Sequence, residues 1–119
     1  GVDAFAEIQA QFQGFGYHGY TSIRMHPWQQ VVFHGERGLL RLTAPFNPMV
    51  FGEAQIEIHQ SNQGVRHERF PAARQYVLQV EAFCRSVRDG AEYPVPLEFS
   101  RGTQAMIDRA FESAGPPTG

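Results

Sequence analysis

The sequence predicts an α+β domain: an open-faced, largely antiparallel or mixed β-sheet of five or six strands, with two C-terminal helices packed on one face. Three observations predict it. Apolar and polar residues alternate with the period of strands through residues 4–70, and apolar residues recur at helical spacing in 71–89 and 97–114. Strands that precede the helices, without alternating with them, are typical of this class. We expect a single domain over 1–119.

The strand patterns are short and are separated by turn-forming residues. Glycine or proline interrupts the alternation after each run, and two four-residue connections, 35–38 and 61–64, contain the glycines expected of hairpins. The strand-like runs are residues 4–12, 17–25, 29–34, 39–42, 55–59 and 65–70. Residues 44–53 contain two prolines, an asparagine and a glycine, which predicts a loop.

Both helix patterns have one apolar stripe and recognisable ends. Pro71 is expected in the first turn of the first helix, and Gly90 follows its end in the position that favours a left-handed backbone. Pro96 is expected to start the second helix. The stripes consist of Tyr76, Val77, Val80, Phe83, Cys84 and Val87, and of Phe99, Thr103, Met106, Ile107, Ala110, Phe111 and Ala114. Each stripe needs a layer to pack on.

Composition excludes several classes of function. The net charge is −2, so no broad basic surface favours nucleic acid or an anionic membrane. The ten basic residues are all arginines, which excludes a lysine Schiff base. No apolar run is long enough to cross a bilayer, and the single Cys84 fits a reducing compartment. We therefore expect a cytoplasmic protein, and the start at Gly1 suggests a piece of a longer one.

Clusters of chemically active residues are sparse. His18, His26 and His34 are spaced by eight residues, which is not the spacing of a zinc site, so no metal site is predicted. No serine has the Gly-x-Ser-x-Gly setting of a hydrolase. Three carboxylates, Glu53, Glu57 and Glu68, are expected to be solvated at strand ends, and Cys84 is expected in the core.

The sheet face that the helices leave open is a candidate interface. It carries glutamines and aromatic residues in a lightly charged mixture, including Gln9, Gln11, Tyr20 and Gln55. A mixture of this kind suits a two-fold contact in which each patch meets its own copy. We expect a homodimer through this face, with Gln9 and Gln11 in the contact; the alternative is that the face is simply hydrated.

The order of these segments resembles the C-terminal domain of the Gfo/Idh/MocA oxidoreductases, the glucose-fructose oxidoreductase and inositol dehydrogenase family. The resemblance consists of a strand, the Gly35-x-x-Gly38 hairpin, a strand that leads into Pro45-Phe46, a helix of the form Tyr76-x6-Phe83-x6-Gly90, and a last helix ending at Ser113-Ala114. It extends over nearly all of residues 4–114. It implies a substrate-binding and oligomerisation domain.

The resemblance also implies a second domain and a cofactor for the longer parent protein. Family members begin with a dinucleotide-binding Rossmann domain, so NAD or NADP is implied for the parent and none for this chain. No G-x-G-x-x-G motif occurs here, and the catalytic Glu-Lys-Pro motif of the family is absent because the chain has no lysine. No catalytic residue can therefore be assigned.

Two functions follow from the sequence. The first is the substrate and oligomerisation domain of an NAD(P)-dependent oxidoreductase that acts on a sugar, polyol or similar hydroxyl compound, inactive by itself. The second is a stand-alone ligand-binding or interaction domain. The candidate substrate contacts are aromatic and hydrogen-bonding residues near one strand end and on the first helix: Tyr20, Arg24, His26, Trp28 and Tyr76.

Overall fold

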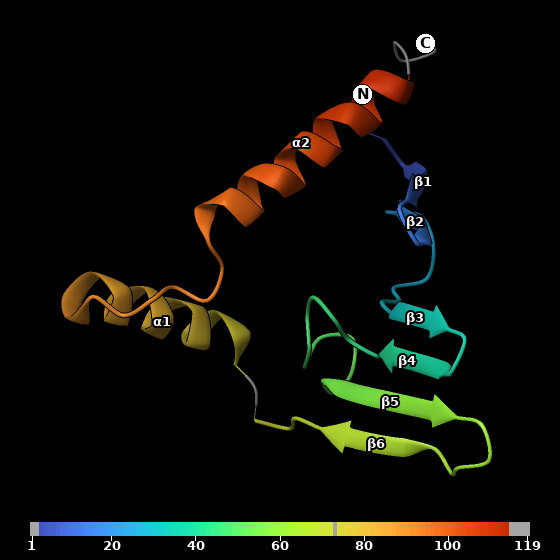
Figure 1. Ribbon diagram of the computed structural model, residues 1–119, viewed down its shortest axis with the longest axis horizontal. Coiled ribbons are helices and arrows are strands. Elements are labelled where there is room, and N and C mark those ends of the chain that lie inside the picture. The colour runs from blue at the N-terminus through green and yellow to red at the C-terminus, as the bar shows by residue number, and fades with distance from the viewer. Residues whose placement is uncertain (1–2, 73, 115–119) are drawn as a thin grey trace. The chain divides into compact units, whose positions relative to one another are not determined.

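A computed structural model describes residues 3–72 and 74–114. Six strands precede two helices (Figure 1). The strands are β1 (Phe5–Phe12), β2 (Phe15–Ser22), β3 (Val31–Gly35), β4 (Gly38–Leu42), β5 (Gln55–Gln60) and β6 (Arg66–Arg69), and the helices are α1 (Gln75–Asp89) and α2 (Leu97–Ala114). The chain divides into two units: one contains the β1–β2 hairpin and the helices from Tyr76 onward, and the other spans Met25–Gln75.

The β1–β2 hairpin has one polar face and one apolar face. Its strands pair antiparallel with Gln9 opposite His18 and Ala10 opposite Tyr17, and Gly14 makes the turn with a φ of 92°. Successive side chains of a strand point to opposite faces. Gln9 and Gln11 therefore share the polar face, whereas the stacked rings of Phe12 and Phe15 lie on the other. A two-stranded hairpin is marginally stable in water by itself.

The second unit contains a four-stranded antiparallel sheet in the order β3-β4-β5-β6 (Figure 1). Its register also separates two faces. One is apolar over β3, β4 and β5, where Phe33, Leu40 and Ile58 lie in one row across the strands. The opposite face carries polar side chains of β4, β5 and β6, namely Arg41, Gln55, Glu57, His59, His67 and Arg69, whereas Arg66 and Glu68 of β6 lie on the side of the isoleucines. The best covered positions are in the middle of the sheet, because β3 and β6 are edge strands.

Both helices begin and end close to the expected residues. Gly90 has the expected left-handed backbone, with a φ of 68°, directly after α1. The backbone N–H of Phe99 bonds to the carbonyl of Pro96 at the start of α2. α1 starts at Gln75, however, so Pro71 lies before the helix and not in its first turn. Neither described helix is both long and apolar enough to cross a bilayer.

The α+β class, with antiparallel strands followed by two helices, is confirmed. Two details of the expectation are corrected. The six strands form two sheets, of two and four strands, in place of one. In addition, Cys84 is exposed and not in the core, and neither described helix has a buried residue. A stripe becomes buried only when another element covers it.

A glycine at the start of β4 is required by close backbone approach. Gly38 has a φ of 157°, and a Cβ at this position would collide with the backbone carbonyl of His59 on β5. We expect Gly38→Ala to destabilise the sheet by roughly 1–3 kcal/mol, because the carbonyl of a paired strand cannot move aside. Urea unfolding measures this change. Gly35→Ala, whose Cβ would meet only an ordinary contact at 3.9 Å, is the matched control and should be nearly silent.

Candidate functional site

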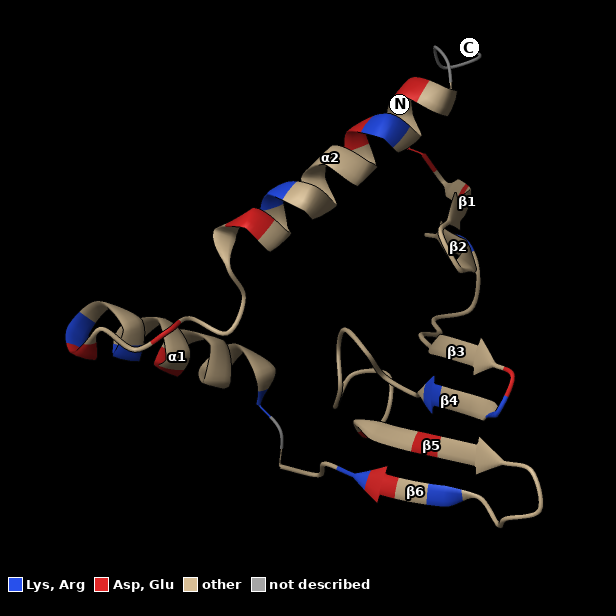
Figure 2. Cartoon of the chain, viewed as in Figure 1, with Lys and Arg blue, Asp and Glu red and all other residues tan. Residues whose placement is uncertain are grey.

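A charged and polar row crosses the four-stranded sheet on one face. The register places Arg41 of β4 opposite Glu57 of β5, and Glu57 opposite His67 of β6. Figure 2 shows that the charged positions of the four strands fall on β4, β5 and β6, whereas β3 has none. Of these charged positions, Arg41, Glu57 and Arg69 lie on the face of the row, and Arg66 and Glu68 lie on the other face.

The Arg41–Glu57 ion pair is the centre of the row. Glu57 is the buried charged residue of the described chain, with 7% of its surface exposed. Its Oε2 accepts a hydrogen bond from Arg41 Nε at 2.7 Å and lies 2.5 Å from Arg41 Nη2. Two donors of one guanidinium on one carboxylate oxygen fix the arginine across the strand boundary and compensate the buried negative charge.

Three neighbours complete the cluster around Glu57. Gln55 Nε2 donates to Glu57 Oε1 at 3.2 Å and also lies 3.2 Å from Nδ1 of His67. When both contacts are hydrogen bonds, His67 Nδ1 accepts, and the N–H of its neutral ring is at Nε2. His59 Nε2 lies 3.7 Å from Glu57 Oε2. Both imidazoles are about half exposed, so they offer donors and acceptors to a ligand or to another protein surface.

The electrostatics of the cluster favour recognition over acid–base chemistry. Burial raises the pKa of Glu57, but the hydrogen bond and the charge of Arg41 lower it, assisted by His59 and His67. The net result is a pKa below the ordinary value of 4.5. A carboxylate held ionised in this way is a weak base at neutral pH. It acts as a fixed acceptor that positions its neighbours.

The lowered pKa of Glu57 predicts acid sensitivity. Because its folded-state pKa lies below its unfolded value, Glu57 contributes stability that is complete above 4.5 and is lost as the pH falls through the folded value. We expect the urea midpoint of the wild-type chain to fall as the pH drops below 4.5, and Glu57→Gln to make that fall shallower. If the urea midpoint changed equally with pH in the two proteins, Glu57 would not contribute to the acid sensitivity of the fold.

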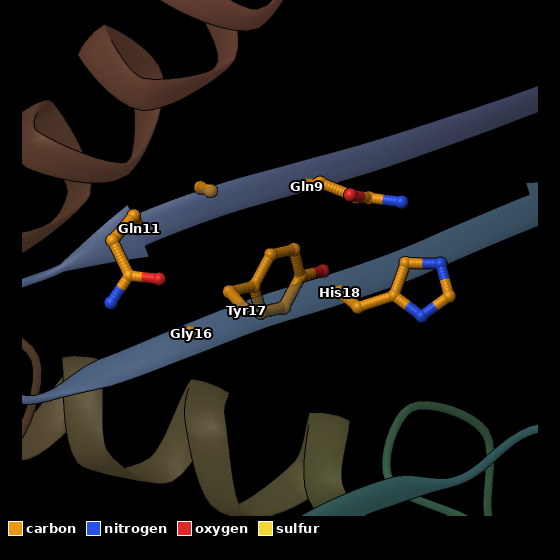
Figure 3. Close-up of a pocket in the computed structure, with 6 residues that line it drawn as sticks. Gln9, Gln11, Gly16, Tyr17 and His18 are labelled. Carbon is orange, nitrogen blue, oxygen red and sulfur yellow. The ribbon is translucent and has the colours of Figure 1, made fainter.

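A second polar surface lies on the β1–β2 hairpin. Figure 3 shows Gln9 and Gln11 on β1 and Tyr17 and His18 on β2 around an open depression. His18 Nε2 lies 2.9 Å from an oxygen of Glu7, and this hydrogen bond, with a smaller contribution from Gln9, lowers the pKa of Glu7. The pair is exposed to solvent. It therefore provides a local polar contact and not a buried site.

The predicted substrate contacts are distributed over three segments. Tyr20 is on β2, where its ring stacks with Phe5 at 6.1 Å, and Tyr76 is in the first turn of α1. Arg24, His26 and Trp28 lie in the connection between β2 and β3. Trp28 is 67% exposed, so its indole is available to a ligand. These five residues remain a prediction.

Sequence reasoning missed the Arg41–Glu57 row. Glu57 was expected to be solvated, and its burial in the middle of the sheet corrects this. The other two carboxylates pair with arginines of β6: Glu53 with Arg69 and Glu68 with Arg66, at 2.6 and 3.1 Å. Gln55 is predicted on the open face of the sheet. In β5, Gln55, Glu57 and His59 alternate with isoleucines, and this pattern could have placed Glu57 and His59 on the same face as Gln55.

Within the described residues, no group of three or more His, Cys, Asp and Glu side chains is arranged to hold a metal ion.

Comparison with known proteins points to an oxidoreductase relationship. The chain is 31% identical over 88 residues to a Rhizobium meliloti protein described as "Uncharacterized oxidoreductase ORF334". The alignment covers 71% of this chain and 26% of that relative, so the chain spans about a quarter of the relative's length. No protein-family model matches the chain. The similarity and the fold are consistent with an oxidoreductase-related α+β domain.

Proposed function

We propose that this chain is the substrate-binding and oligomerisation domain of an NAD(P)-dependent oxidoreductase of the Gfo/Idh/MocA type. The parent enzyme acts on a sugar, a polyol or a similar hydroxyl compound, and the chain is inactive by itself. The observation that carries the proposal is the two-faced sheet, with an apolar face and an opposite face centred on the Arg41–Glu57 pair. The similarity to a protein described as an oxidoreductase supports the redox context.

The described residues do not fit a dinucleotide. A dinucleotide site needs a parallel strand, a glycine-rich turn and a helix whose N-terminus faces the pyrophosphate. Both described sheets are antiparallel. The sequence between β6 and α1, residues 70–74, is FPAAR and contains no glycine. We therefore assign NAD or NADP to the Rossmann domain proposed for the parent, and we propose no step of hydride transfer for this chain.

The chemistry of the polar face suits neutral hydroxyl compounds. Half-exposed imidazoles and the Gln55 amide supply both donors and acceptors, which is what a hydroxyl group requires. Arg41 is already paired with Glu57, so a charged ligand is not needed to neutralise the charge of Arg41. Aromatic surface of the kind that packs against sugar rings is available at Trp28 and Tyr76.

Trp28 allows a direct binding test, because it is the single tryptophan of the chain. Titration with a panel of hexoses and cyclic polyols is expected to change its fluorescence in a saturable way. Arg24→Ala should weaken that change, and Arg37→Ala, in the exposed β3–β4 turn, is the matched control. A flat signal with every hydroxyl compound would count against substrate binding by this domain.

A further inference from the structure

Three polar atoms on the polar face of the four-stranded sheet form a small triangle. Nε2 of Gln55 lies 3.2 Å from Oε1 of Glu57 and 3.2 Å from Nδ1 of His67, and the latter two atoms are 3.9 Å apart. The register sets Glu57 of β5 directly opposite His67 of β6, and all three residues belong to the unit Met25–Gln75. Their mutual distances are therefore a property of this sheet alone.

The Gln55 amide can bridge the other two side chains only while the ring of His67 is neutral. The NH2 group of an amide donates hydrogen bonds and does not accept them, so its contact with Nδ1 is a hydrogen bond only when that nitrogen has a free lone pair. In the imidazolium ion both ring nitrogens carry a proton. Protonation of His67 therefore sets an N–H of the ring against an N–H of Gln55, and the contact becomes repulsive.

The Glu57 carboxylate is the nearest acceptor for a protonated His67. Its Oε2 bonds to Arg41, whereas the described hydrogen-bond partner of Oε1 is the Gln55 amide, which the imidazolium can replace. A small rotation of the ring brings Nδ1 from 3.9 Å to hydrogen-bond distance of Oε1. The new bond is charge-assisted and is roughly twice as strong as the neutral bond that it replaces. Inverting the Gln55 amide is a poorer response, because its oxygen would then face the carboxylate.

The remaining charged groups around His67 are already paired or face another atom. They are Arg41 of β4, His59 of β5, Arg69 of β6 and Glu53, which precedes β5. The two arginines pair with Glu57 and Glu53, and His59 lies near Oε2 of Glu57, the oxygen that does not face His67. Among the described ion pairs, Glu57 is the carboxylate that His67 approaches.

We propose that His67 is a proton-operated switch in this row. The neutral ring is joined to Glu57 through Gln55; when Nδ1 takes a proton from solvent, the ring bonds to Glu57 directly and releases the Gln55 amide. The released amide offers both N–H groups and its carbonyl to a hydroxyl compound, so binding at this face becomes tighter as the pH falls. This consequence for a ligand rests on the proposed function, whereas the exchange of hydrogen bonds does not.

Double-mutant cycles at two pH values test the exchange in the full chain. An unperturbed imidazole is mostly neutral at about pH 8 and mostly charged at about pH 5, whereas Glu57, with a pKa below 4.5, is ionised at both. Gln55→Ala and His67→Ala, singly and together, are compared by urea unfolding. At the higher pH their effects on the folding equilibrium constant are expected to be coupled by roughly two- to tenfold, the size of one neutral hydrogen bond. At the lower pH the coupling should disappear.

The matched control exchanges one histidine for the other. His59→Ala takes the place of His67→Ala in the cycle, because none of the described hydrogen bonds joins His59 to Gln55, and it should show no coupling with Gln55→Ala at either pH. A Gln55–His67 coupling that persists at the lower pH is the sign of an inverted amide. That result, or no coupling at the higher pH, would overturn the proposal.

Nitrogen NMR of the wild-type chain tests the same exchange without any substitution. At the higher pH, Nδ1 of His67 is expected to be the ring nitrogen without a proton, and the side-chain amide resonances of Gln55 should shift with the same midpoint as the ring. A proton on Nδ1 of the neutral ring, or Gln55 resonances that do not follow the titration, would contradict the switch. Neither measurement uses a ligand, so a flat sugar titration leaves both results unaffected, and the switch and the proposed function fail separately.

Discussion

Arg41→Leu is expected to lower the urea midpoint of the chain more than replacement of any other arginine. Its guanidinium is the main partner of the buried Glu57, through contacts of 2.7 and 2.5 Å. Removing one partner of a buried pair leaves an uncompensated charge in a poorly solvated place. The measurement is urea unfolding at neutral pH, followed by circular dichroism.

Two variants show whether the pair itself is responsible. Arg41→Leu with Glu57→Leu removes both charges and should recover stability relative to Arg41→Leu, because two apolar side chains can replace a buried ion pair. Arg69→Leu, whose partner Glu53 is more exposed, should have a smaller effect. If Arg41→Leu and Arg69→Leu lowered the urea midpoint by equally small amounts, the buried Glu57 would not need Arg41 to compensate its charge.

Gln9→Arg combined with Gln11→Arg is expected to weaken self-association at least tenfold. Both glutamines lie on the polar face of β1, and a two-fold contact through that face would bring the new charges of one copy toward those of the other. Light scattering over a range of concentrations measures the change. The expected wild-type state is a homodimer.

The matched control places the same two charges elsewhere. Gln63→Arg and Gln79→Arg add them to the β5–β6 loop and to α1, both exposed, and should leave association unchanged. Equal weakening by both pairs would mean that net charge, and not the β1 face, controls association. A wild-type monomer at roughly 100 μM would remove the dimer from the proposed function.

The sequence predicts elements of this fold better than their pairing. The bounds of α2 agree with the expected 97–114, because Pro96 and the apolar stripe define its start and extent. The start of α1 was placed too early, since Pro71 is compatible with a first turn but does not require one. Alternation defines the two faces of a strand but says little about which strands pair. For that reason five or six strands were expected in one sheet where the structure has two sheets.

The candidate site depends on long-range register in the same way. The alternation in β5 indicates that Glu57 and His59 share a face, but it cannot place Arg41 opposite Glu57, sixteen residues earlier in the chain. Burial of a carboxylate also contradicts the usual preference of glutamate for the surface. Only the pairing of β4 with β5 explains it, because that pairing supplies the compensating guanidinium.

The central claim is that this domain serves an oxidoreductase without holding its nucleotide, and titration with NADH and NADPH tests it most directly. The fluorescence of each nucleotide is followed as the isolated chain is added. The account predicts no saturable change for either one, because the chain has no G-x-G-x-x-G turn and its described strands all pair antiparallel. Saturable binding at micromolar concentrations would require a complete nucleotide site within these residues, and would contradict the account.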